Sequence, residues 1–128
     1  MKTIEYHKTN YANENVDIEI ADNPGSGGAH HRYIVSGFDT ETNPSATMPY
    51  NSVEILFQNG PIAEVGVNGL THEVLIAILI NRLECFQAGP YACEENRLAL
   101  DHLHSALEAL HSRTIKRIIR GVEGTHTI

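Results

Sequence analysis

Hydrophobic and polar positions alternate through much of the first seventy residues. Residues 16–22 place Val16, Ile18 and Ile20 around acidic residues, a period of two that predicts a strand with one solvent-exposed face. Residues 2–7 and 30–37 have an extended pattern as well and predict two further strands. The Asn, Pro, Gly and Ser residues at 23–28 interrupt the chain between them, so a hairpin with a loose loop is expected.

A second hairpin is predicted further along the chain. Residues 53–58 and 62–67 flank Asn59-Gly60, the strongest short hairpin signal in the sequence. Pro61 follows directly and requires an offset turn or an edge position, because proline cannot donate to a sheet ladder. Residues 40–50 are rich in Pro, Asn, Ser and Thr and indicate a surface loop. Together these segments predict about four antiparallel strands.

The hydrophobic period changes at Leu70. Residues 72–87 predict a helix with apolar side chains on more than one face, and the Thr71 hydroxyl is placed to cap it. Gly89 suits the left-handed position that closes a helix, and Pro90 prevents its continuation. A second helix, roughly 40 Å long at 1.5 Å per residue, is expected over residues 93–120.

Two helices joined by so short a turn form an antiparallel hairpin. The sequence therefore predicts an α+β protein, with a small antiparallel sheet before a long C-terminal helical hairpin. The expected division is a β region at residues 1–70 and a hairpin with a ligand-binding C-terminal tail at residues 71–128, which together form one compact unit.

One face of the second helix carries a regular stripe. Its members step by four, three, four and three residues: Asn96, Leu100, Leu103, Leu107 and Leu110. Such a stripe packs on the first helix or on a partner subunit. The same stepping continues to Thr114 and Arg117. At about 100° per residue, Arg113, Arg117 and Arg120 fall within roughly a 60° arc, so three guanidinium groups are expected on one side of the last two turns.

The charge of the chain reverses near its end. Up to Leu110 fifteen Asp and Glu residues outweigh five Lys and Arg, whereas from His111 four basic residues accompany only Glu123, within a net charge of −7. A local positive patch on an acidic protein favours a small anionic ligand, since a nucleic-acid surface would extend the basic field over a whole face. Arginine binds phosphate bidentately, and the glycines of residues 121–126 permit close backbone approach. The alternative is that the arginines compensate the helix dipole or form a solvated basic face.

Phe86 and Asn96 lie on either side of the Gly89-Pro90 turn. An aromatic face can stack a purine and an amide can read its edge; the alternatives are a core ring and an ordinary polar residue at a helix start. The turn lies some tens of ångströms from the arginines. One protomer cannot easily bring Phe86 and Arg117 onto one ligand, whereas an antiparallel homodimer can, because a two-fold axis places opposite ends together.

Several other features of the sequence limit the classes of function that the protein can have. The sequence shows neither a membrane span nor a secretory signal, so a cytoplasmic protein is expected. Cys85 and Cys93 are expected to be buried thiols, with a disulfide as the alternative. Eight histidines include no metal-binding spacing, and no catalytic constellation is present. These absences predict a protein that is not an enzyme and holds no metal or cofactor.

Several blocks of residues resemble a known family. They are Gln58–Pro61, Val67–Thr71, FQAGPYACEEN at residues 86–96, Arg113-Thr114 and RGVEGTH at residues 120–126. Across residues 53–126 the chain resembles the phage anti-Thoeris sponge proteins, relatives of the anti-CBASS cyclic-nucleotide sponges. The resemblance implies a non-enzymatic protein that sequesters glycocyclic ADP-ribose, the cyclic ADP-ribose isomer made by defence TIR proteins. It also implies binding of cyclic di- and trinucleotides and assembly into dimers or hexamers.

The same resemblance implies roles for individual residues. Phe86 would lie against the adenine, Asn96 on its edge or the ribose, and Arg113 with Arg117 on the pyrophosphate, in a pocket shared by two subunits. Arg120 and the tail residues Gly124-Thr125-His126 would serve a second nucleotide site at an oligomer interface. A contact from the strands is also implied, for which Arg32 and Gln58 are the candidates.

The leading hypothesis is therefore capture of a cyclic adenine-nucleotide signal without turnover. A protein that works by stoichiometric capture needs affinity and no transition-state groups. One alternative is a phosphodiesterase that hydrolyses such nucleotides. Another is a structural oligomeric module whose arginines bind an acidic protein partner, and a binder of nucleic-acid polymers ranks third.

Overall fold

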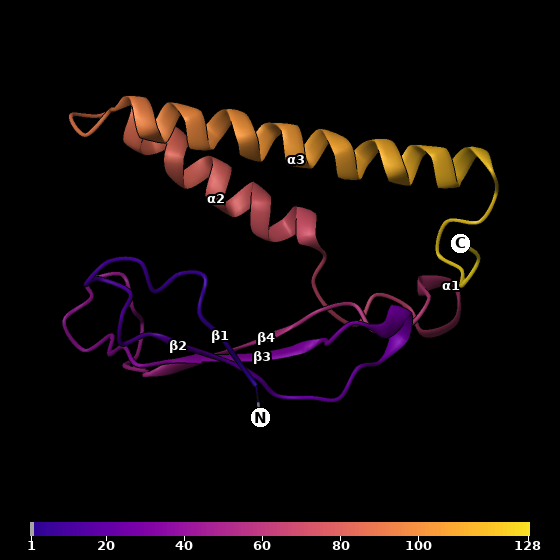
Figure 1. The fold of residues 1–128 in the computed structure, drawn as a ribbon, viewed down its shortest axis with the longest axis horizontal. Coiled ribbons are helices and arrows are strands. Elements are labelled where there is room, and N and C mark those ends of the chain that lie inside the picture. The colour runs from indigo at the N-terminus through magenta and orange to yellow at the C-terminus, as the bar shows by residue number, and fades with distance from the viewer. Residues whose placement is uncertain (1) are drawn as a thin grey trace. The chain divides into compact units, whose positions relative to one another are not determined.

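The computed structural model in Figure 1 describes residues 2–128. The chain divides into two compact units, one ending at Asn59 and the other comprising Gly60–Ile128. The first unit is an antiparallel β-sheet and the second is a helical hairpin. The protein is therefore α+β, as the sequence predicts.

The sheet contains four strands in the order β1-β2-β3-β4, and every neighbouring pair is antiparallel. The strands are β1 (Thr3–Ile4), β2 (Asp17–Ile20), β3 (Arg32–Ser36) and β4 (Ser52–Leu56). The predicted hairpin of β2 and β3 is confirmed, and its loop contains a short 3₁₀ helix, η1 (Ser26–Gly28).

Apolar side chains gather on one face of this sheet. Ile18 pairs with Val35, and Val35 pairs with Val53. Successive side chains point to opposite faces of a strand, so the residues two positions along, Ile20, Tyr33 and Ile55, share the face of the first three. The ring of Tyr33 also meets that of Phe57 edge to face, with centroids 5.7 Å apart. The period-two pattern of the sequence thus produced the predicted one-sided sheet.

The second predicted hairpin is wrong. Beyond Asn59-Gly60 the chain forms a short helix, α1 (Ile62–Val65), instead of a strand. Pro61 has no N–H for a ladder, and its carbonyl accepts hydrogen bonds from the N–H groups of Glu64 and Val65 at 3.0 and 2.9 Å. A proline at this place starts a helical turn more readily than it continues a hairpin.

Two longer helices, α2 (His72–Gln87) and α3 (Glu94–Ile119), run antiparallel and contact each other (Figure 1). Thr71 occupies the N-cap position of α2, but its hydroxyl makes no capping hydrogen bond. Gly89 does not have the predicted left-handed backbone. Ala88 ends α2 in a right-handed helical conformation, and the N–H of Gly89 then reaches the carbonyl of Phe86 at 3.2 Å, so no left-handed residue is needed.

The predicted stripe on α3 is confirmed. All five of its members are half-buried, whereas most of their neighbours on the helix are exposed. The stripe continues to Thr114, half-buried, and to Arg117, which is buried. Ile80 of α2 is the only buried large hydrophobic residue among residues 2–128.

Helix α3 has 26 residues and α2 has 16, so the last turns of α3 extend beyond α2 (Figure 1). Three isoleucines on this extension are largely exposed: Ile115, Ile118 and Ile119. Within residues 2–128, no helix combines the length and the apolar character that a bilayer crossing requires.

Candidate functional site

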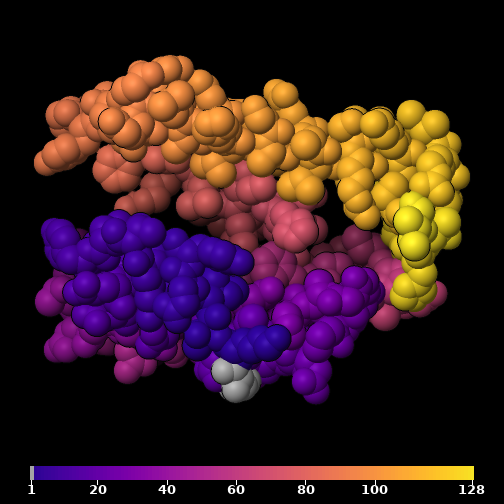
Figure 2. Space-filling model, in the orientation of Figure 1, coloured from indigo at the N-terminus to yellow at the C-terminus, as the bar shows by residue number. Residues whose placement is uncertain are grey.

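The C-terminal end of α3 closes with a reversal of the chain at Gly121. Its φ of 73° is the left-handed conformation that glycine adopts without strain. The N–H of Gly121 donates to the carbonyl of Ile118 at 2.9 Å, and that of Val122 donates to the carbonyl of Arg117 at 3.0 Å. This pair of hydrogen bonds is the Schellman arrangement. Residues 121–128, the C-terminal tail, therefore turn back at the end of the helix, where Figure 2 shows them in yellow.

Arg117 is the centre of this tail. Its side chain is only 10% exposed. The Nη1 atom donates to the main-chain oxygens of Thr127 at 2.6 Å and Ile128 at 3.4 Å, and Nη2 donates to those of Val122 at 3.0 Å and Thr125 at 3.2 Å.

The remaining donor of Arg117, Nε, lies 3.4 Å from a carboxylate oxygen of Glu123. A guanidinium group has five N–H donors, and every nitrogen of this one faces an oxygen of the tail. The predicted anion-binding arginine is thus buried and committed to its own chain.

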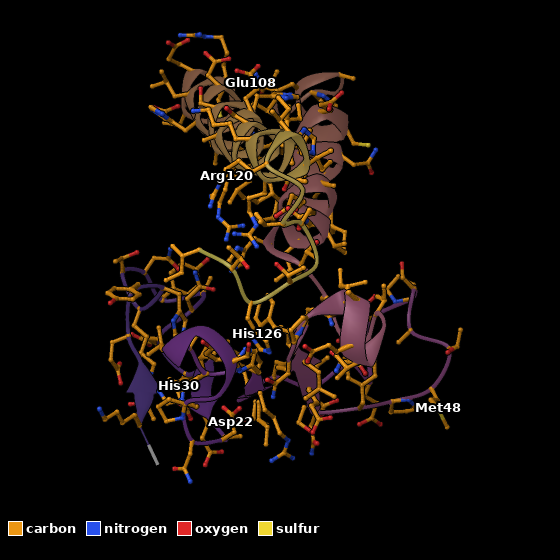
Figure 3. The ribbon with its side chains drawn as sticks, turned by 90° about the vertical axis from the view of Figure 1, so that its right-hand side faces the viewer. Asp22, His30, Met48, Glu108, Arg120 and His126 are labelled. Carbon is orange, nitrogen blue, oxygen red and sulfur yellow. The ribbon has the colours of Figure 1, made fainter. Side chains whose placement is uncertain are left out.

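Arg120 and Thr125 also serve the tail. Nη1 of Arg120 donates to the main-chain oxygen of Ile128 at 2.8 Å; Figure 3, which views α3 from its C-terminal end, labels this arginine. The Thr125 hydroxyl donates to the carbonyl of Val122 and accepts the N–H of Thr127 at 3.2 Å. These contacts hold the tail in a compact loop.

The tail also contacts α1. The N–H of Ala63 donates to the carbonyl of Gly124 at 3.0 Å, and Nε2 of His126 lies 3.5 Å from a carboxylate oxygen of Glu64. Gly124 has a φ of 79° and brings its backbone against α1, whereas the sequence predicts a close backbone approach to phosphate in this segment. Helix α1, absent from the sequence prediction, therefore helps to fix the tail.

Two other cations at this end lack a protein partner. Arg113 and Lys116 are exposed, and within residues 2–128 neither side chain makes a hydrogen bond, ion pair or ring contact. Elsewhere on the same helix Arg97 is paired with both Glu94 and Asp101, the latter at 2.9 Å. The hydrogen bond from Arg97 lowers the pKa of Glu94. The sequence prediction included Arg113 and overlooked Lys116.

The turn end of the hairpin carries Phe86, a residue that is 38% exposed. The guanidinium carbon of Arg82, one helical turn earlier, lies 5.2 Å from the ring centroid, a cation–π contact. Arg82 is not among the residues predicted from the sequence, although its spacing of four residues from Phe86 places both on one helix face. One face of the ring therefore has a cation of the same chain beside it.

Gln87 ties the two helices together across the turn. Its Oε1 accepts the N–H of Cys93 at 2.9 Å, and its Nε2 donates to the carbonyl of Cys93 at 3.1 Å. Both Cys85 and Cys93 are free thiols, but they are exposed and not buried as predicted. The physical reason is that α2 and the turn here have no covering element within the hairpin, so side chains off the α2–α3 seam face solvent.

Asn96 lies in the first turn of α3 and is half-buried on the stripe. Seventeen positions separate it from Arg113, which corresponds to roughly 25 Å along the helix. A single chain therefore keeps Phe86 and Asn96 at one end of the hairpin and the basic residues at the other, as the sequence predicts.

The sheet candidates have local partners. Nε of Arg32 donates to a carboxylate oxygen of Glu54 at 2.7 Å on the neighbouring strand, and Gln58 is half-buried after β4. Among residues 2–128, no three His, Cys, Asp or Glu side chains are arranged to hold a metal ion.

Comparison with known proteins bears on the hairpin. A sequence model of the Acb2/Tad1 hairpin domain matches residues 49–114, just over half of the chain. The chain belongs to the Acb2/Tad1 hairpin family. A protein of Bacillus phage SBSphiJ7 named Thoeris anti-defense 1 is 50% identical over 70 residues, which cover 55% of this chain and 49% of that relative.

The comparison thus spans about half of that relative's length. Phe86, Asn96 and Arg113 lie inside the residues that the Acb2/Tad1 hairpin model matches, whereas Arg117, Arg120 and Thr125 lie beyond them. The family assignment suggested by the sequence blocks is confirmed.

Proposed function

We propose that this Acb2/Tad1 family protein is a phage anti-defence sponge. It binds glycocyclic ADP-ribose made by TIR proteins of the host, removes the signal from solution and leaves it intact. Cyclic di- and trinucleotides are further ligands of the same kind. The protein acts in the cytoplasm of the infected bacterium, where the signal is made.

The observation that carries this proposal is that aromatic and amide side chains lie at one end of the hairpin and basic side chains at the other. An exposed aromatic ring and an amide, Phe86 and Asn96, occupy the turn end, and the basic residues occupy the other end of α3. Adenine offers a flat face and an edge, and the pyrophosphate offers two negative charges. Phe86 and Asn96 bind the adenosine part, while Arg113, Arg117, Arg120 and Thr125 make up the phosphate end.

Two copies of the chain complete one site. The ends of α3 are too far apart for a single cyclic nucleotide, so the turn of one protomer meets the C-terminal end of the other across a two-fold axis. Exposed apolar residues support such assembly, because a soluble monomer rarely leaves a contiguous apolar patch uncovered. Ile119 is 80% exposed and Ile118 59% exposed on the extension of α3. The proposed assembly is a homodimer that can associate further into a hexamer.

Capture without turnover agrees with the side chains at both ends. The candidate binding residues there carry aromatic, amide, guanidinium and hydroxyl groups, which bind and orient a nucleotide. The name of the Bacillus phage relative, Thoeris anti-defense 1, supports a role against Thoeris defence.

The test is recovery of the ligand. The protein is incubated with the product of a Thoeris TIR enzyme, separated from free nucleotide, heated to denature it, and the released material is identified by mass spectrometry. Recovery of the intact cyclic nucleotide at a fixed ratio to protein supports the sponge. A linear or hydrolysed product would favour a phosphodiesterase, and no bound nucleotide would favour a module for acidic protein partners.

Paired variants locate the site. Phe86→Leu removes the stacking ring, and Arg113→Gln removes the exposed guanidinium. Each should raise the Kd for the nucleotide about 5- to 150-fold, since a base stack and a charge-assisted phosphate contact are each worth about 1–3 kcal/mol. Arg97→Gln, an exposed arginine in an internal ion-pair network, is the control and should bind normally. Native mass spectrometry of the complexes gives the number of subunits together with the bound mass.

A further inference from the structure

Four cationic side chains share the C-terminal end of α3. Arg113, Lys116, Arg117 and Arg120 fall within roughly a 100° arc of the helix, at about 100° per residue. Two of them are committed to the tail and two are not, so they are not equivalent.

Arg117 directs all its donors into the chain itself, and Arg120, which is exposed, directs its Nη1 there. Five tail oxygens surround the guanidinium of Arg117, and Nη1 of Arg120 reaches the main-chain oxygen of Ile128. A phosphate oxygen cannot take an N–H of Arg117 in this structure without displacing a tail oxygen. The contribution of Arg117 is therefore the shape of the tail.

Arg113 and Lys116 form an exposed pair of like charges. They are three positions apart, a spacing at which helix side chains are neighbours and like charges destabilise. Neither has an acidic partner within residues 2–128, whereas Arg97 on the same helix is neutralised from two sides. The repulsion between Arg113 and Lys116 would be relieved by an anion bound between them.

We propose that Lys116 is a ligand-binding residue that, with Arg113, contacts the two phosphate groups of the nucleotide. Arg117 and Arg120 are positioning residues that fold the tail beside this pair. The assignment rests on the proposed function, and it identifies which of the basic residues touch the ligand. Arginine supplies a planar fork and lysine a compact charge with rotatable donors, so together they can meet phosphate groups in two orientations. Lys116 lies outside the residues that the Acb2/Tad1 hairpin model matches.

The experiment compares Lys116→Gln with Lys2→Gln. Lys2 is also exposed and precedes β1, so the two variants change the net charge equally at places in different units of the chain. Binding is measured by calorimetry with two probes, glycocyclic ADP-ribose and adenosine, which carries no phosphate. Lys116→Gln should raise the Kd for glycocyclic ADP-ribose about tenfold, the effect of losing one charge-assisted hydrogen bond. It should leave any binding of adenosine unchanged, and Lys2→Gln should change neither.

Two further measurements separate binding from structure. Lys116→Arg keeps the charge and should restore the Kd to within about threefold of the wild type. The dependence of Kd on salt should be weaker for Lys116→Gln than for Lys2→Gln, because one phosphate contact has been removed. Thermal denaturation without ligand should give the same Tm for both glutamine variants.

Three results would overturn the assignment. If the wild type binds glycocyclic ADP-ribose and Lys116→Gln binds it equally well, the inference fails and the proposed function stands. A lower Tm with an unchanged Kd would show that Lys116 only compensates the helix dipole. If the wild type binds no glycocyclic ADP-ribose, the proposed function fails first and the inference falls with it.

Discussion

Nη1 of Arg117 lies 2.6 Å from the main-chain oxygen of Thr127, ten residues further along the chain. The tail has no regular secondary structure after Gly121, so its carbonyl groups find their partners on this side chain. A single buried guanidinium therefore determines the path of the last residues. Its neighbour Arg113, on the same side of the helix, makes no such contact.

Replacing Arg117 with glutamine should destabilise the protein by about 2 kcal/mol. Four main-chain oxygens and the Glu123 carboxylate lose a charged donor, although the oxygens of Val122 and Ile128 keep another donor each, from Thr125 and Arg120. Hydrogen bonds to charged groups are worth more than neutral ones. The exposed Arg113→Gln should stay within about 0.5 kcal/mol of the wild type. Urea denaturation at one fixed protein concentration measures both.

Hydrogen exchange of the tail provides a second readout for the arginine. Arg117→Gln should speed exchange of the amides after Gly121, including Val122, whose N–H otherwise bonds within the helix cap. Equal stability and equal tail exchange in the two glutamine variants would refute the central role of Arg117.

The two hydrogen bonds between Gln87 and Cys93, across the connection of α2 and α3, give a graded prediction of stability. Gln87→Ala removes both hydrogen bonds to Cys93 and should cost about 1 kcal/mol of unfolding free energy, whereas Gln87→Glu keeps the acceptor for the Cys93 N–H and should cost less. Thermal denaturation of the two variants checks the order. A larger loss for glutamate than for alanine would show that the acceptor contact is not the important one.

Two glycines of the sheet unit differ in the space beside them. A Cβ at Gly37 would lie 1.9 Å from the carbonyl oxygen of Asn15, whereas a Cβ at Gly27 meets nothing within 4 Å; both have positive φ. Gly27→Ala should cost about 1 kcal/mol through backbone strain alone. Gly37→Ala must in addition move the backbone and should cost at least about 3 kcal/mol. Similar chemical denaturation midpoints for both variants would contradict this.

The Asp22 carboxylate makes the stability of the sheet unit depend on pH. Partial burial is the largest influence and raises its pKa, but the N–H groups of His31 and Arg32 and the nearby charges of His30 and His31 outweigh it, so the pKa lies below its ordinary value of 3.8. The two oxygens accept the N–H of His31 at 3.2 and 3.0 Å, and Figure 3 labels Asp22 and His30 side by side.

The pKa of Asp22 is lower in the folded than in the unfolded protein. The ionised carboxylate therefore stabilises the fold at pH values above its ordinary pKa. That contribution is lost as the pH falls through the folded pKa. Asp22→Asn should therefore be less stable than the wild type at pH about 7, and the difference should shrink towards pH about 2. A difference that stays constant across this range, measured by urea denaturation, would exclude the carboxylate as its source.

The stripe on α3 shows how far sequence periodicity reaches. Stepping from Asn96 to Leu110 predicted both the packed face and its continuation to Arg117, because a straight helix keeps the same face over its whole length. The same reasoning could not show what covers Arg117. Its partners are mainly backbone oxygens of the tail. Every residue carries such an oxygen, so the sequence does not indicate which of them bind Arg117.

The strand predicted after Gly60 is wrong for a different reason. Alternating apolar residues at positions 62–67 are compatible with a strand or with one turn of helix, and only the neighbouring Pro61 distinguishes them. Similarly, the burial of Cys85 and Cys93 was predicted from residue type, although at the turn no other part of the hairpin covers them. The structure and burial of a short segment depend on its neighbours more than on its own hydrophobic pattern.

The side chains of α3 reverse the electric field that its backbone alone would produce. The backbone makes the start of a helix attractive to anions and its end repulsive, with the equivalent of roughly half a charge at each end. Here Glu94 and Glu95 occupy the start, while full positive charges crowd the end. An approaching anion is consequently repelled from the Glu94 end and drawn to the other, so the side chains, and not the backbone, decide at which end of α3 a negative group arrives.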